Sequence, residues 1–147
     1  MDVGSNNSGV ASRLSNFTAR RFVFDGVECN SMEGLLQSFK FDKVHIQEEV
    51  CKLVGFAAKK RGFKRDWRTN QMLYWKGVAY ARKSEGYQQL LDRAYKALFE
   101  NEHFRKDLLS TGNAVFTHSI GKHKESETVL TEREFCSRLT RLRDGAL

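Results

Sequence analysis

Proline is absent from the 147-residue sequence, although it makes up about 5% of average proteins. Every helix end and turn must therefore depend on Gly, Asn, Asp or Ser, which stop helices and form turns by other means. This constraint favours a helix-rich protein. A length of about 150 residues predicts one domain, which we place at residues 13–147, after a flexible Gly/Ser/Asn-rich segment at residues 1–12.

Apolar side chains recur at helical spacing in several parts of the chain. Two of these segments begin with the pattern of a capping box, in which a polar residue is followed three positions later by Glu. The two pairs are Asn30 with Glu33 and Thr131 with Glu134. Gly55 is a candidate break within one helix. The predicted helices cover residues 30–42, 46–62, 84–98, 101–109 and 131–142.

The remaining secondary structure is expected to be short. Apolar residues on both sides of Asp25-Gly26 predict a β-hairpin, because this dipeptide tolerates the positive φ of a type I′ turn. We expect residues 67–80 to be helical and residues 115–116 to form a brief strand. The fold class is therefore α+β and predominantly helical, a compact multihelical domain with a small N-terminal β-hairpin. Parallel βαβ units are absent, which excludes Rossmann and P-loop folds.

Composition excludes several classes of protein. No apolar run approaches the roughly 20 residues of a membrane-spanning helix, and residues 1–17 lack the apolar region of a secretory signal. Three cysteines without Cys-x-x-Cys spacing argue against a disulfide framework and favour a cytoplasmic location. The four histidines have no metal-binding spacing, and we expect no metal or other cofactor. The net charge of +7 favours an anionic partner such as a phosphate compound or a nucleic acid.

Residues 59–68 interleave six basic residues with Phe63 and Trp67, and Trp75 follows shortly. An aromatic face can stack on a base while Lys and Arg bind phosphates, so this segment is typical of a nucleotide site. The ordinary alternative is a charged surface that contacts only water.

Glu33 has two interpretations, which the residues alone leave open. As the last member of a capping box, it would stabilise its helix by about 1 kcal/mol. Beside the apolar Leu35 and Leu36, desolvation could instead raise its pKa and suit it to general acid–base catalysis.

Several blocks of the sequence together resemble the signature of the NADAR (YbiA-like) family. The first three read Ser-Asn-Phe at residues 15–17, Phe-Asp-Gly at residues 24–26, and Ser-Met-Glu-Gly-Leu-Leu-Gln-Ser-Phe-Lys-Phe at residues 31–41. The segment 57–67 is similar to the family's Ala-rich block that ends in Asp-Trp, and residues 96–114 are similar to its helix pair that ends in Leu-Leu-x-Thr-Gly-x-Ala. The resemblance covers residues 14–143 in the family order.

This resemblance implies a YbiA-like fold and an N-glycosidase that replaces a base nitrogen with water at a ribosyl anomeric carbon. Its substrate would be ADP-ribose on guanine, including ADP-ribosylated DNA, or a related ADP-ribose conjugate. Glu33 would be the catalytic residue, with Asn16 and Phe17 beside it, and Trp67 would stack on or enclose the base. The other residues that the resemblance assigns to substrate binding are Asn16, Phe17, Lys40, Arg61, Lys64, Arg65, Asp66, Thr111 and Gly112.

The sequence departs from the family pattern towards its C-terminus, which suggests a divergent subgroup. Residues 117–121 and 127–135 stand where the family has a Trp-Gly block that also supplies an Asn. The candidate substitutes are Trp75, His118, Thr131 and Glu132, although Glu132 could simply complement the dipole of its helix. Three alternatives remain. One is an N-glycosidase for riboflavin-pathway ribosylaminopyrimidine phosphates, and another is a non-catalytic ADP-ribose or NAD sensor. The third is a generic basic nucleic-acid-binding protein, which no known binding motif in the sequence supports.

Overall fold

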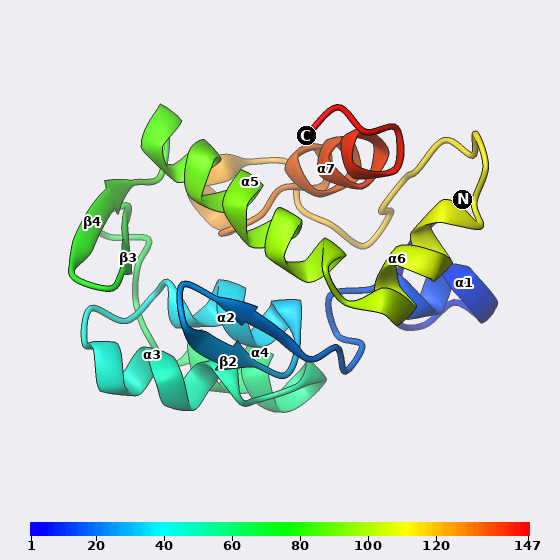
Figure 1. Cartoon of the computed structure of the whole chain (residues 1–147). Coiled ribbons are helices and arrows are strands. Elements are labelled where there is room, and N and C mark those ends of the chain that lie inside the picture. The colour runs from blue at the N-terminus through cyan, green and yellow to red at the C-terminus, as the bar shows by residue number, and fades with distance from the viewer.

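The computed structural model describes residues 1–147, and its longest helix, α5 (Glu85–Phe99), runs through the middle of the molecule (Figure 1). The side chain of Ser84 caps this helix by accepting a hydrogen bond from the Tyr87 amide. Its buried residues recur at the predicted helical spacing, which confirms the predicted helix. They are Tyr87, Leu90, Leu91, Ala94, Tyr95 and Leu98.

Three short helices pack together on one side of α5 and replace the two that the sequence predicts there. The second predicted helix is divided, because the chain leaves helical geometry after Cys51 and Gly55 begins a new helix with a φ of 57°. Gly34 lets the first helix approach the other two, since a Cβ there would lie 2.6 Å from the Leu53 carbonyl oxygen. These helices are α2 (Met32–Ser38), α3 (Val44–Cys51) and α4 (Gly55–Phe63).

On the other side of α5 lies the C-terminal helix, while the helix that follows α5 packs against the N-terminal helix (Figure 1). The capping box at Thr131 and Glu134 is confirmed, because both of its hydrogen bonds are present. Asn101 caps a second helix, which buries Phe104 and Leu108 and leaves Leu109 51% exposed. The helices are α1 (Gly9–Arg13), α6 (Glu102–Leu109) and α7 (Glu132–Arg143), with a 3-10 turn, η1 (Glu125–Glu127), before α7.

Two antiparallel hairpins complete the fold. The first joins β1 (Phe22–Phe24) to β2 (Val27–Cys29), and its turn has φ values of 48° at Asp25 and 79° at Gly26, as predicted. The second joins β3 (Met72–Trp75) to β4 (Val78–Ala81). It lies where the sequence suggested a helix, because Lys76 and Gly77 also adopt positive φ and form the same type of turn.

The first residues of the chain are held against a distant segment, in contrast to the flexible segment that the sequence predicts. Val3 is fully buried, and its amide donates to the Thr117 carbonyl. The Asp2 carboxylate accepts hydrogen bonds from the amide and hydroxyl of Ser119. The brief strand expected at residues 115–116 is reduced to a single parallel bridge between Asp2 and Thr117.

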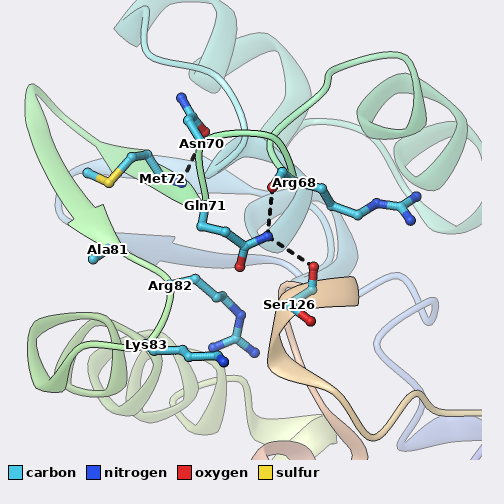
Figure 2. Close-up of a pocket in the computed structure, with 8 residues that line it drawn as sticks. All are labelled: Arg68, Asn70, Gln71, Met72, Ala81, Arg82, Lys83 and Ser126. Carbon is cyan, nitrogen blue, oxygen red and sulfur yellow. Dashed lines mark hydrogen bonds between the residues drawn. The ribbon is translucent and has the colours of Figure 1, made fainter.

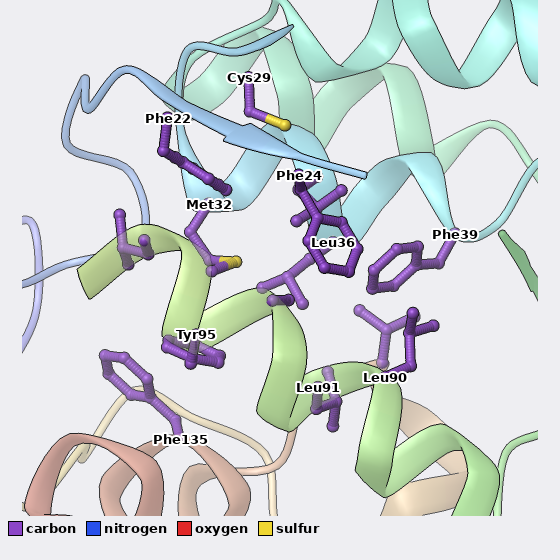
Figure 3. Packing of buried hydrophobic residues seen from close by; sticks show 14 of the residues in the cluster. Phe22, Phe24, Cys29, Met32, Leu36, Phe39, Leu90, Leu91, Tyr95 and Phe135 are labelled. Atoms are coloured by element: carbon purple, nitrogen blue, oxygen red, sulfur yellow. The ribbon is translucent and has the colours of Figure 1, made fainter. Parts of the chain in front are cut away.

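The hydrophobic core extends over both sides of α5 (Figure 3). On one side, Leu90 lies towards aromatic residues of the first hairpin and of the end of α2, such as Phe24 and Phe39. On the other side, the ring of Tyr95 lies 6.2 Å from that of Phe135 in α7. The predicted fold class, a predominantly helical α+β domain, is confirmed. No helix combines the length and apolar character needed to cross a membrane.

Candidate functional site

Glu33 lies in the first turn of α2, but it is not the capping residue that the sequence suggested. Ser31 caps the helix by accepting from the Gly34 amide, while Asn30 donates to the Lys52 carbonyl. The Glu33 carboxylate is therefore free of any capping bond. It accepts one hydrogen bond, of 2.9 Å, from Nε2 of Gln37 one turn later, and it forms no ion pair.

The surroundings of the Glu33 carboxylate determine its protonation. Burial raises the pKa of Glu33, and this effect exceeds the opposing one of the Gln37 hydrogen bond. Positive charge from Lys40, Lys59 and His118 also opposes the rise. A carboxyl group with a raised pKa, surrounded by cations that do not pair with it, is typical of sites that transfer protons.

Lys40, two turns after Glu33, has the opposite shift. Burial lowers the pKa of Lys40 to about 8, although the charge of Glu33 acts to raise it. The positive charges of nearby Arg68, Lys122 and Lys59 contribute to this lowering of the pKa. The Lys40 ammonium also lies 3.4 Å from the Gly62 carbonyl oxygen at the end of α4. Near neutral pH this group can therefore both donate a proton and bind an anion.

Gln37 is held in a tight space between α2 and α4. Its side chain is buried, and its Oε1 has no hydrogen-bond partner. A Cβ on Gly62 would lie 1.8 Å from this oxygen, so only glycine allows α4 to approach so closely. The amide that contacts Glu33 is thus positioned by the packing of two helices.

The Ser-Asn-Phe segment lies against Glu33, as the resemblance implies. The Glu33 amide donates to the Asn16 carbonyl over 3.0 Å, and the Asn16 side chain accepts from the Tyr95 hydroxyl over 2.9 Å. Burial raises the pKa of Tyr95 well above its usual value, so this hydroxyl remains a donor. The Phe17 ring lies below the Lys59 ammonium, at 6.0 Å.

A hollow of about 270 Å³ adjoins this group of residues through Lys40. Trp67 forms part of its wall and is almost completely buried. Asp66 also accepts hydrogen bonds from the Arg68 and Thr69 amides, so its carboxylate stabilises the local turn. Five of the residues singled out from the sequence line this hollow together with Phe63 and Arg68: Lys40, Lys64, Arg65, Asp66 and Trp67.

A second hollow, of about 550 Å³, lies beside the hairpin of β3 and β4 (Figure 2). Arg68 lines both hollows. In the larger hollow, the Gln71 side-chain amide donates to the carbonyl oxygens of Arg68 and Ser126. Glu33 lines neither hollow, but Lys40, which interacts with the charge of Glu33, lines the smaller one and not the larger. We therefore place the candidate site at the smaller hollow.

Comparison with known proteins identifies the family of this chain. Residues 9–144 match the family described as bacteriophage protein GP30.3. The chain belongs to the GP30.3 family. It is 35% identical to an uncharacterized 17.1 kDa protein from the Gp30–rIII intergenic region of Enterobacteria phage T4, over 99% of this chain and 97% of that protein.

The fold of this GP30.3 family member is YbiA-like. The NMR structure of the E. coli protein YbiA aligns with 97% of this chain and 80% of its own, with a TM-score of 0.63. The two sequences are only 19% identical, so the likeness concerns the fold. The YbiA-like architecture implied by the sequence resemblance is therefore confirmed.

Two of the candidate substitutes for the missing C-terminal block in this GP30.3 family member are His118, which lies near Glu33, and Glu132, which lies next to His118. His118 acts on the charge of Glu33, although 85 positions separate them in the chain. Glu132 is close to His118, because a Cβ on Gly121 would contact both residues. Its carboxylate pairs with the His123 ring at 2.9 Å.

The other two candidate substitutes have structural roles. The side chain of Thr131 caps α7. Trp75 lies in the core and not in either hollow. Its ring stacks on Phe24 at 5.3 Å, and its Nε1 donates to the Asp25 carboxylate. Trp75 belongs to a strand, in which successive side chains point to opposite faces, and its own side chain lies on the buried face. The helix expected for this segment did not predict this orientation.

Three further candidates also lie outside the group around Glu33. The Thr111 hydroxyl accepts from Arg143 of α7, and Gly112 next to it has the positive φ of a helix-ending turn. The Arg61 guanidinium stacks on the Phe41 ring at 4.7 Å.

The structure adds four residues to the site or its border. Two of them, Lys59 and Arg68, belong to the basic segment 59–68 that the sequence indicates, whereas Gln37 and Lys122 were not predicted. The four residues bring an amide and three positive charges to Glu33 and Lys40: Gln37, Lys59, Arg68 and Lys122. The spacing of four residues between Glu33 and Gln37 was a local signal for their contact, whereas Lys122 is brought in only by the tertiary fold. No cluster of three or more His, Cys, Asp or Glu side chains could hold a metal ion.

Proposed function

We propose that this protein is an N-glycosidase of the NADAR type, in a divergent subgroup. It would hydrolyse the bond between a ribosyl anomeric carbon and a base nitrogen. The substrate would be a guanine that carries ADP-ribose. The observation that carries the proposal is the Glu33 carboxylate, which burial leaves with a raised pKa and without an ion pair. The sequence resemblance and the YbiA-like fold support it.

The reaction requires a carboxylate beside the sugar. As the bond from the anomeric carbon to the base nitrogen breaks, its electron pair leaves with the base and positive charge develops on the sugar. Glu33 would stabilise this charge and accept a proton from the water that attacks the anomeric carbon. The base nitrogen takes up a proton, so the products are the free base and the free sugar.

Lys40 is the candidate donor of that proton. A pKa of about 8 keeps Lys40 charged at neutral pH and able to release its proton without a large energetic cost. We therefore expect the rate to fall as pH rises through about 8, because the donor is then deprotonated. In the Lys40→Arg variant we expect a loss of about 10²-fold or more in rate, because Arg stays protonated and cannot release the proton. The decline above about pH 8, which is the upper limb of the pH profile, should also disappear from the residual rate. An upper limb that survives in this variant would exclude Lys40 as the donor.

The smaller hollow supports a phosphorylated substrate. Lys40, Lys64, Arg65 and Arg68 line it beside Trp67, and Asp66 is its one acidic residue. Cations of this kind bind phosphate oxygens, and Arg does so with two parallel hydrogen bonds. A diphosphate in this hollow would place its ribosyl group towards Lys40 and Glu33.

The proposal is tested by incubating the protein with an ADP-ribosylated guanine oligonucleotide and, separately, with a ribosylaminopyrimidine phosphate. Mass spectrometry would detect released ADP-ribose or ribose 5-phosphate. We expect release from the first substrate, and a loss of about 10²- to 10⁴-fold in the Glu33→Gln variant. Glu28→Gln, on the exposed edge of the first hairpin, is the matched control and should retain full activity.

Two other outcomes would replace the proposal. Release from the pyrimidine substrate alone would assign the riboflavin-pathway reaction to this site. Binding of ADP-ribose without release from either substrate would identify a sensor, as the altered C-terminal block allows.

A further inference from the structure

The outer face of α4 exposes two aromatic rings to solvent. Phe56 and Phe63 are 74% and 78% exposed, and no other phenylalanine is among the exposed large hydrophobic residues. They are seven positions apart, which places them on the same face of the helix about 10 Å from each other. Between them on this face lie Lys59 and Lys60, both exposed. We call these four residues, with Lys64, the α4 face.

The positive charge of the protein is concentrated around this face. Residues 52–68 contain seven basic residues and one acidic residue, so they account for almost all of the net charge of +7. The carboxylate of the acidic residue, Asp66, accepts hydrogen bonds from the backbone amides of its own turn. Asp42 approaches the area as well, but it pairs with Arg65 at 3.7 Å. The α4 face is thus complementary to a polyanion.

We propose that the α4 face binds a single-stranded segment of nucleic acid, by stacking bases on Phe56 and Phe63. Flat rings separated by cations meet the two needs of such a strand, which are base stacking and neutralised phosphates. A duplex hides the faces of its bases, so it cannot use these rings. A membrane would favour a continuous apolar strip, whereas here two lysines separate the rings.

The position of the α4 face connects it to the candidate site. The Lys59 ammonium lies above Phe17, next to Glu33, while Phe63 and Lys64 line the smaller hollow. A strand on the α4 face would therefore extend past the site where a modified base is processed. The inference goes beyond the proposed hydrolysis, because the strand binds whether or not a bond is cleaved.

Fluorescence anisotropy with a labelled, unmodified oligothymidylate of about 15 nucleotides tests the inference. We expect binding to the wild type and a roughly tenfold weaker affinity in each of Phe56→Ala and Phe63→Ala. Leu109→Ala, which removes an exposed apolar side chain from α6, is the control and should not change the affinity. One phosphate contact from each of the three lysines of the α4 face predicts a slope of about −2 when the logarithm of affinity is plotted against the logarithm of salt concentration.

Leucine variants separate stacking from general apolar contact. Phe56→Leu and Phe63→Leu keep an apolar side chain but lose the flat ring, so we expect them to bind as weakly as the alanine variants, whereas Phe56→Trp retains affinity. Full affinity in the leucine variants would overturn the inference, as would equal binding of duplex DNA. Binding to phosphatidylglycerol vesicles in preference to the oligonucleotide would assign the surface to a membrane instead.

The inference and the proposed hydrolysis can fail separately. Glu33→Gln should bind the oligonucleotide with wild-type affinity, because Glu33 is not part of the α4 face. Strand binding without hydrolysis would remove only the proposed function. Hydrolysis by a protein that does not bind the oligonucleotide would remove only the inference.

Discussion

Two glutamates that lie in the first turn of their helices have opposite surroundings. Glu33 in α2 and Glu134 in α7 both lie in the first turn of a helix that a hydroxyl side chain caps. Arg82 donates two hydrogen bonds to Glu134, of 3.0 and 2.6 Å, and the Thr131 amide and the Gln88 side chain add two more. Glu33 accepts one hydrogen bond, from Gln37.

The difference in partners sets the chemistry of the two groups. Burial acts to raise the pKa of Glu134, but the hydrogen bonds from Arg82 and Gln88 outweigh it and lower the pKa. At Glu33 the balance is reversed, and burial raises the pKa. A carboxylate with every lone pair occupied stabilises the fold, while one left with a single partner remains available for a substrate.

The largest expected effect is on stability, in the Glu134→Gln variant. Arg82 is completely buried, and the substitution leaves its guanidinium with only the longer ion pair to Glu125, at 3.8 Å. We expect a loss of about 3–5 kcal/mol in the free energy of unfolding, measured in urea. Glu127→Gln, on the exposed 3-10 turn, should change stability by less than about 0.5 kcal/mol. A small loss at Glu134 would mean that the two glutamates do not differ as described.

A smaller effect is expected when the one partner of Glu33 is displaced. In Gly62→Ala, the new methyl group would collide with the Gln37 side chain and push it away from Glu33. We expect a stability loss of about 1–3 kcal/mol and a reduced rate of hydrolysis. Gly86→Ala in α5 is the control, because its Cβ would meet only ordinary contacts, from 3.4 Å outwards. Unchanged activity in Gly62→Ala would show that Gln37 does not position Glu33.

The local signals in the sequence explain why one glutamate was assigned correctly and the other was not. Thr131 and Glu134 form the capping box that their spacing predicts. Asn30 and Glu33 have the same spacing, but the helix begins one residue later, at a cap supplied by Ser31. A cap depends on one or two hydrogen bonds, so neighbouring polar residues compete for it and spacing cannot decide between them.

The parts of the site that come from distant segments could not be predicted from spacing. The proximity of Asn16 to Glu33 followed from the family resemblance, and the structure agrees with it. Residues such as Lys122 and Arg68 reach the site through tertiary packing. Trp75 was misplaced because an aromatic residue near cations can face either a ligand or the core, and its strand turns it towards Phe24.

The smallest expected effect concerns the pH dependence of stability in Glu33→Gln. Because the pKa of Glu33 is raised in the folded protein, the folded state binds more protons than the unfolded state between the usual and the raised pKa. Wild-type stability therefore falls as pH rises through this window, and the variant lacks this fall. We expect the variant to be more stable at neutral pH and equal to the wild type below about pH 4. Urea unfolding at several pH values measures the difference.

An NMR titration of the Glu33 carboxyl carbon tests the central claim most directly. The resonance is assigned by its absence from the Glu33→Gln spectrum, and Glu28 serves as an exposed reference in the same sample. The account predicts a titration midpoint for Glu33 above the ordinary value of about 4.3, with Glu134 below it. A Glu33 midpoint at or below that of Glu134 would contradict it, because both carboxylates would then be equally occupied by the fold.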